Sequence, residues 1–196
     1  MRSNPVIALA VVMGLAPMTT LAMQFSLSGD QLFMSGIINH NDHCKFLIQA
    51  ANHPNLTTVV INSPGGDAWA GASLGMMFRL ANVTAVVPQG AVAYSAAAIA
   101  VVAAPRKRIL GSIAFHSPYL PKGANDGLSR ADLYQVKHKV ASVLSSSGVS
   151  DRDIDRIMAA PPNRLVKVVM ETADGPTAAP RNGDRIRALA DLCGRM

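Results

Sequence analysis

The sequence is poor in charged and aromatic residues. Of its 196 residues, 15% are charged and 5% are aromatic, whereas 49% are hydrophobic. This balance excludes an intrinsically disordered chain, which would be rich in charge and poor in apolar residues. The length allows one domain with a sizeable core, filled mainly by Ala, Val, Leu, Ile and Met.

The sequence also lacks the patterns of several binding classes. The net charge is +6, but the basic residues are dispersed apart from Arg106–Arg108 and a scatter between Arg164 and Arg195. No aromatic residues interleave with them, so we expect no nucleic-acid partner. No tandem repeat of fixed period is present, and we expect no cofactor.

Only two cysteines are present, Cys44 and Cys193. In an oxidising compartment they could form a disulfide, and two separate thiols are the alternative. His40, Asp42 and His43 lie next to Cys44, but their spacing matches no standard zinc pattern. A solvated helix cap is the favoured interpretation of this cluster, so we expect no metal.

The first residues have the pattern of an export signal. Arg2 precedes an apolar, uncharged run over Pro5–Met18, and small residues lead to Ala22. We expect cleavage after Ala22, which divides the chain into a signal peptide, 1–22, and one domain, 23–196. An uncleaved membrane tether is the alternative, because the uncharged run to Met23 is just long enough to cross a bilayer. No cysteine follows the run, so a lipid anchor is not indicated.

Strand and helix patterns alternate along the rest of the chain. A hairpin is expected around 24–34, and buried-type strands at 56–61 and 83–87 each precede a helix pattern. The expected helices are 43–52, 68–81, 95–103, 130–144, 151–159 and 181–193, and two further short strands are 108–110 and 112–115. This order predicts an α/β domain with a mostly parallel sheet.

Two strand-to-helix junctions carry candidate chemistry. In the first, Ser63-Pro64-Gly65-Gly66 precedes a helix, and the glycines let backbone N–H groups approach an anion. In the second, Ser95 opens an Ala-rich helix, where it is either an ordinary N-cap or a nucleophile. His116 follows an expected strand and is the candidate base, although a histidine bonded to backbone is the alternative.

Three segments together resemble the proteolytic subunit of the Clp protease. They are INSPGGDAWAGASLG, VVPQGAVAYSAAAIAVVAAPRKRI and GSIAFHSPY, and the resemblance extends from about Phe25 to Ser117. The chain is also similar to exported, Clp-like proteins of the bacterial periplasm. This resemblance implies the ClpP/crotonase fold, a spiral of β-β-α units in a single domain, and a periplasmic or secreted location.

The resemblance also assigns roles. Ser95 corresponds to the nucleophile and His116 to the general base, while the N–H groups of Gly66 and Ala96 correspond to the oxyanion hole. The family places an acidic residue some fifty positions beyond the histidine. Here the rivals for that third role are Asn163 and Asp174, and either could instead be an ordinary turn residue.

The chain departs from the family at several positions. Ala93 and Ala97 stand where exported relatives commonly carry cysteines. Tyr94 is bulkier than the residue usual before the serine, and its ring could occlude the cleft. No long helix that stacks subunits into rings is evident at 117–129, so a homo-oligomer is open but a tetradecameric barrel is not implied.

The resulting hypothesis is an exported serine peptidase that acts on peptides or unfolded segments. An inactive Clp-like module for peptide binding or oligomerisation is the main alternative. A crotonase-type acyl-CoA enzyme shares the fold, but CoA chemistry suits an exported protein poorly.

Overall fold

A computed structural model describes residues 21–120, 129–168 and 181–195. Within these ranges the strands are β1 Gln24–Ser28, β2 Gln31–Ser35, β3 Thr58–Asn62, β4 Thr84–Val87, β5 Val92–Tyr94, β6 Arg106–Ile109 and β7 Ser112–Ala114. The helices are α1 Asp42–Asn52, α2 Ala68–Ala81, α3 Ala96–Ala103, α4 Arg130–Ser145, α5 Asp151–Ala159 and α6 Gly183–Cys193. Among the described residues, no helix is both long enough and apolar enough to cross a membrane.

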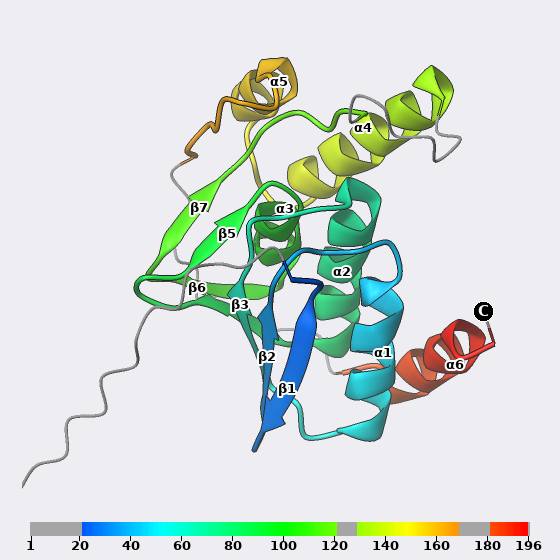
Figure 1. The fold of residues 1–196 in the computed structure, drawn as a ribbon. Coiled ribbons are helices and arrows are strands. Elements are labelled where there is room, and N and C mark those ends of the chain that lie inside the picture. The colour runs from blue at the N-terminus through cyan, green and yellow to red at the C-terminus, as the bar shows by residue number, and fades with distance from the viewer. Residues whose placement is uncertain (1–20, 121–128, 169–180, 196) are drawn as a thin grey trace, which may run out of the picture.

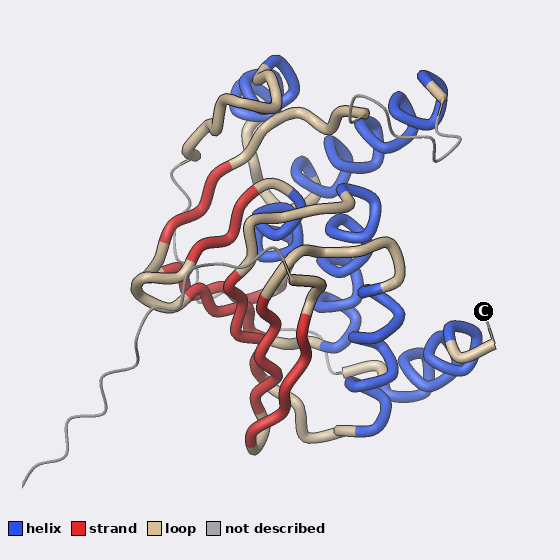
Figure 2. Tube along the Cα trace, in the orientation of Figure 1, coloured by secondary structure: helices blue, strands red, loops and turns tan. Residues whose placement is uncertain are grey.

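The strands form two sheets, with helices packed mainly on one side of the larger one (Figures 1 and 2). The larger has the order β1-β2-β3-β4-β6, and all its pairs are parallel except the β1–β2 hairpin. The smaller joins β5 to β7 in parallel. The mixed α/β fold with a mostly parallel sheet expected from the sequence is therefore confirmed.

The residues after β3 connect the two sheets. Ser63 pairs with Ala93 of β5, while Gly66 pairs with Ile38 on the other side. The loop between β3 and α2 is thus held between two neighbouring segments. This arrangement fixes the backbone of the Ser-Pro-Gly-Gly motif.

Helix α3 is buried along its whole length because it consists only of Ala, Val and Ile. It packs closely against α2, where Gly71 faces Ala96: a Cβ at Gly71 would lie 2.4 Å from the Ala96 carbonyl oxygen. The absence of a side chain at Gly71 therefore lets the first turns of α2 and α3 lie side by side.

Helix α6 is attached to the outside of α1 (Figure 1). Cys44 and Cys193 form a disulfide, with their α-carbons 5.3 Å apart. The Arg181 guanidinium donates hydrogen bonds to the carbonyl oxygens of Ala50, His53 and Leu56 near the end of α1. Both contacts fix the C-terminal segment at a distance from the β5–α3 turn.

Candidate active site

Ser95 occupies the turn between β5 and α3 in a strained conformation. Its φ of 52° and ψ of −119° are unusual for any residue other than glycine. Such a conformation costs about 1–3 kcal/mol and persists only where the surroundings impose it. Here the Ser95 N–H donates to the Ala114 carbonyl at 2.8 Å, and the Ser95 carbonyl accepts from Ile99 N–H at 3.1 Å.

The Ser95 side chain is not an ordinary helix cap. It accepts no hydrogen bond from the first turn of α3, and the side chain is only partly buried. Within the described part of the chain its hydroxyl forms no hydrogen bond at all. A strained strand-to-helix turn that leaves a serine hydroxyl accessible is also how other hydrolase folds present a nucleophile.

The Ser-Pro-Gly-Gly loop lies directly against this turn. A Cβ at Gly65 would lie 2.9 Å from the Ser95 Cβ and 2.6 Å from the Tyr94 carbonyl oxygen. Gly65 also has a φ of +105°, which an L side chain rarely adopts. Glycine is therefore required at this position for the two loops to meet.

Two backbone N–H groups are available beside Ser95. The Gly65 carbonyl and the Asp67 N–H both bond to Ile38 in a parallel bridge, a pattern in which the N–H of the central residue, Gly66, faces away from Ile38. Ala96 is the first residue of α3, where an N–H has no partner within the helix. In the described structure neither the Gly66 nor the Ala96 N–H has a hydrogen-bond acceptor, and both come from loops that contact each other.

His116 lies at the carboxyl end of the strand paired with β5. Tyr94 is opposite Ala114, and the Ser95 N–H donates to the Ala114 carbonyl oxygen. Ser95 thus follows the last residue of β5, and His116 follows β7 by two residues. Both residues therefore lie at the carboxyl edge of the small sheet.

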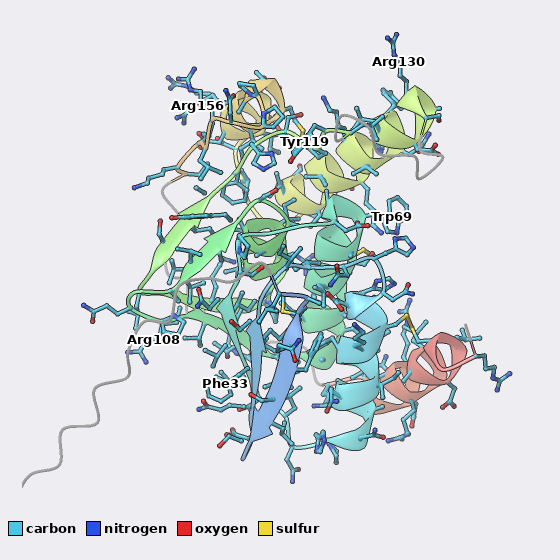
Figure 3. All side chains as sticks on the ribbon, in the orientation of Figure 1. Phe33, Trp69, Arg108, Tyr119, Arg130 and Arg156 are labelled. Atoms are coloured by element: carbon cyan, nitrogen blue, oxygen red, sulfur yellow. A yellow bond between two sulfur atoms is a disulfide. The ribbon has the colours of Figure 1, made fainter. Side chains whose placement is uncertain are left out.

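The imidazole of His116 has contacts from its own segment. Its Nδ1 lies 2.9 Å from the Ser117 carbonyl oxygen. The ring of Tyr119 lies beside it, with centroids 5.6 Å apart. Figure 3 places Tyr119 above the carboxyl end of β7, whereas Trp69 projects from α2 on the other side of that helix.

Tyr94 does not block this edge. Its hydroxyl donates to Ser112 Oγ at 3.2 Å. Ser112 lies two residues before Ala114, the partner of Tyr94, so the ring lies back along β7, away from its carboxyl end. The ring thus does not take the occluding position that the sequence left open.

Of the two candidates for a third catalytic member, Asn163 lies among the described residues. Asn163 is exposed in the turn closed by the bond from Arg164 N–H to the Pro161 carbonyl, and no hydrogen bond joins it to His116. Asp174 lies outside the described residues. The described part of the chain thus places no side-chain amide or carboxylate on His116.

The residues considered for a metal have other partners. Asp42 accepts hydrogen bonds from Asn39 N–H and Lys45 Nζ, and Cys44 is in the disulfide. His43 Nδ1 lies 3.0 Å from the His40 carbonyl oxygen, and burial lowers the pKa of His43. The expected solvated cap is wrong for this cluster, because Asp42 and Cys44 are buried and no side chain caps α1.

A lysine contact on the other side of α2 was not expected from the sequence. Lys139 of α4 lies 3.5 Å from the ring centroid of Trp69 and donates to Ser73 Oγ at 2.8 Å. Burial lowers the pKa of Lys139, while the negative charge of Asp67 opposes that shift. No local pattern could predict this contact, because Trp69 and Ser73 are far from Lys139 along the chain.

The comparisons with known proteins support the fold. No protein-family model matches the sequence, and no curated protein is similar to it. Among solved structures, ClpP1 from Listeria monocytogenes is similar with a TM-score of 0.50 and 19% identity, over 71% of this chain and 83% of that chain.

Two further solved structures have similar values. The 1510-N membrane-bound stomatin-specific protease, as a variant, has a TM-score of 0.49 and 19% identity over 65% of this chain and 67% of that chain. The ClpP protease catalytic domain from Plasmodium falciparum has a TM-score of 0.49 and 17% identity over 68% and 74%. The chain has a ClpP-like fold.

Proposed function

We propose that the chain is a serine peptidase that cleaves peptides or unfolded segments with Ser95 as nucleophile. The observation that carries this proposal is the strained backbone of Ser95, because a helix cap alone gives no reason to hold a serine at a φ of 52°. The Ser95 turn contacts the loop that carries the Gly66 N–H, it is followed by the Ala96 N–H, and His116 follows the strand that pairs with β5.

The proposed reaction uses these groups in sequence. His116 removes the hydroxyl proton as Ser95 Oγ attacks the peptide carbonyl carbon. The carbonyl oxygen becomes an oxyanion, which the N–H groups of Gly66 and Ala96 stabilise. His116 then gives the proton to the leaving amine, and water releases the acyl group by the same steps in reverse. Removing one oxyanion donor from such a site typically costs about 3–4 kcal/mol of transition-state stabilisation.

The experiment is covalent labelling with a fluorophosphonate probe, followed by peptide mapping. The parent protein is expected to carry the probe on Ser95. Ser95→Ala is expected to abolish labelling and His116→Ala to slow it by at least about 100-fold. Labelling of Ser95→Ala at the parental rate would exclude this nucleophile.

Ser73→Ala is the matched control. Ser73 is hydrogen-bonded to Lys139, but it is only 6% exposed and its hydroxyl donates to the Trp69 carbonyl. This variant is expected to label like the parent. Loss of labelling in a folded Ser73→Ala protein would move the nucleophile to the other side of α2.

The absence of a bond between Ser95 and His116 in the described structure keeps the peptide-binding module as the second candidate. A catalytic hydrogen bond often tightens only when substrate is present, so the present spacing suits either function. Peptide binding without labelling or turnover would favour the module.

The proposed setting is outside the cytoplasm, after cleavage following Ala22. In the folded domain Met23 is buried and its N–H donates to the Ile37 carbonyl, so the new terminus would be anchored at the sheet. Mass spectrometry of the exported protein is expected to find Met23 as the first residue. A chain that retains Met1 would support the membrane tether instead. Separately, analytical sedimentation of the mature protein would give its oligomeric state.

A further inference from the structure

The hydrogen bond of His116 determines which ring nitrogen carries the proton. Nδ1 lies 2.9 Å from the Ser117 carbonyl oxygen. A carbonyl oxygen can only accept, so Nδ1 must donate and carry the proton in the neutral ring. The Nε2 lone pair is then free to accept a proton, which is the tautomer that a general base next to Ser95 needs.

The Ser117 carbonyl is held rigidly enough to orient a ring. Ser117 is 6% exposed, and its N–H donates to the Ala160 carbonyl at 3.1 Å. Two residues earlier, Phe115 exchanges two backbone hydrogen bonds with Val166, at 2.9 and 2.7 Å. The strand around His116 is therefore paired on its outer edge as well as with β5.

Pro118 restricts the same peptide unit from the other side. A residue that precedes proline is confined to extended backbone conformations, and the proline ring at Pro118 is itself buried. The direction of the Ser117 carbonyl is thus fixed by its neighbours. The Tyr119 ring then lies against the imidazole that this carbonyl holds.

We propose that Ser117 is the positioning residue of the site, and that its backbone carbonyl takes the role of the side-chain acid in a Ser-His-Asp triad. This inference rests on the proposed function, because positioning matters only if His116 is the base. The site then works as a dyad of Ser95 and His116. Asn163 and Asp174 are not needed for it.

The first experiment reads the tautomer directly. The protein is labelled with ¹⁵N-histidine, and a two-bond ¹H–¹⁵N NMR correlation spectrum of the imidazole rings is recorded. The pH is about 8.5, where an ordinary imidazole is neutral. The chain has five histidines, and the spectrum of His116→Asn identifies the signals of His116. The expected pattern has a protonated Nδ1 and an unprotonated Nε2, and the opposite tautomer would overturn the proposal.

Two variants separate the carbonyl from the rival side chains. In Asn163→Ala and Asp174→Ala the Nδ1–H tautomer and the rate of peptide hydrolysis are expected to stay as in the parent. Loss of that tautomer in either variant, or a fall in kcat of more than about 10-fold, would assign the positioning role to that side chain.

A third variant removes the restriction that Pro118 places on the direction of the Ser117 carbonyl. Pro118→Gly is expected to mix the two tautomers and to lower kcat about 10- to 100-fold with little change in KM, because misplacing a catalytic group slows chemistry more than binding. Pro88→Gly, in the turn before β5, is the matched control, because it adds the same conformational entropy to the unfolded chain. This variant is expected to keep the His116 tautomer and the kcat of the parent. An unchanged tautomer and kcat in Pro118→Gly would contradict the proposal.

The experiments still distinguish the positioning role of Ser117 from the peptidase proposal if one of the two fails. Should Pro118→Gly not fold, the parent spectrum and the two rival variants still decide between carbonyl and side chain. Should Ser95 fail to label while His116 keeps its Nδ1–H tautomer, the peptidase proposal fails and the histidine geometry stands. Labelling of Ser95 with the opposite tautomer would overturn the positioning role alone.

Discussion

At the scale of residues, the conformation of Ser95 is the feature with the clearest energetic consequence. Its φ of 52° and ψ of −119° are close to those of the first central residue of a type II′ turn, a position that glycine favours. A serine held there stores strain that glycine would not have.

We therefore predict that Ser95→Gly stabilises the fold by about 1 kcal/mol relative to Ser95→Ala while both abolish labelling. Alanine keeps the strained Cβ but removes the hydroxyl, so it is the matched control. Urea denaturation of the two variants measures the difference. Equal stabilities would show that the turn imposes no strain on the side chain.

A second prediction at the scale of residues concerns how the stability of the fold depends on pH. Burial lowers the pKa of His43 below its ordinary value of 6.5, so below that pH the unfolded state binds a proton more readily than the folded state. Stability is then fully present above about pH 6.5 and declines as the pH falls below it. His43→Gln is expected to reduce this loss of stability at low pH. His138→Gln, at an exposed histidine, is the control and is expected to leave the loss unchanged. Thermal melts from pH 7.5 to 5 measure both.

At the scale of elements, the contact between α2 and α3 positions the oxyanion donors. A Cβ at Gly71 would lie 2.4 Å from the Ala96 carbonyl oxygen, which is backbone and cannot turn aside. Gly71→Ala must therefore separate the first turns of the two helices.

We predict that Gly71→Ala lowers the free energy of unfolding by about 1–3 kcal/mol and slows labelling of Ser95. Gly183→Ala is the control, because at the start of α6 the nearest contact to a new Cβ is the end of a flexible arginine side chain at 3.7 Å. It is expected to be neutral or slightly stabilising. A Gly71→Ala protein as stable as the parent would show that α3 can shift without cost.

The element boundaries show what the sequence could predict. The helix 68–81 was predicted with its observed ends, because its apolar pattern begins after an Asp cap and ends at Asn82. The helix 151–159 was also placed correctly, since Ser150 caps it and Pro161-Pro162 follow it. Local signals determined both.

Two strands were predicted less well because their reasons are not local. β5 was missed, since three residues before a helix carry no periodic pattern and become a strand only by pairing with Ser63 and β7. β6 begins at Arg106, two residues before the predicted strand 108–110, and charged residues such as Arg106 and Lys107 are not typical of a strand. Arg106 bonds to Asn82 and Thr84, and Lys107 bonds to carbonyls at the end of α3, so both charges have partners.

The residues of the candidate site also divide into those that the sequence predicts and those that it does not. Ser95, His116, Gly66 and Ala96 could be proposed from the sequence because a motif resemblance ties them together. The carbonyl of Ser117 could not, because a backbone group has no residue type to read. Nor could the position of Tyr94, which depends on Ser112 across the strand pair.

At the scale of the whole molecule, the disulfide joins two distant parts of the chain. Cys44 and Cys193 are separated by 149 residues, and closing so long a loop restricts the unfolded state strongly. The helix it holds lies outside α1 and away from the β5–α3 turn (Figure 1).

The double variant Cys44→Ala/Cys193→Ala is therefore predicted to lose about 3–5 kcal/mol of stability but to label at Ser95 at the parental rate while folded. Denaturation of the variant and of the parent, both without reductant, measures the loss, and the parent in reductant is expected to match the variant. A folded double variant that fails to label would show that α6 supports the site.

The central claim is that groups from two separate loops act on one substrate carbonyl: the Ser95 hydroxyl attacks its carbon, and the Gly66 and Ala96 N–H groups bind its oxygen. The crystal structure of the fluorophosphonate adduct tests it most directly. The account predicts phosphorus bonded to Ser95 Oγ and the phosphoryl oxygen about 2.7–3.1 Å from both the Gly66 and Ala96 nitrogens. An adduct on another residue, or a phosphoryl oxygen turned away from both N–H groups, would contradict it.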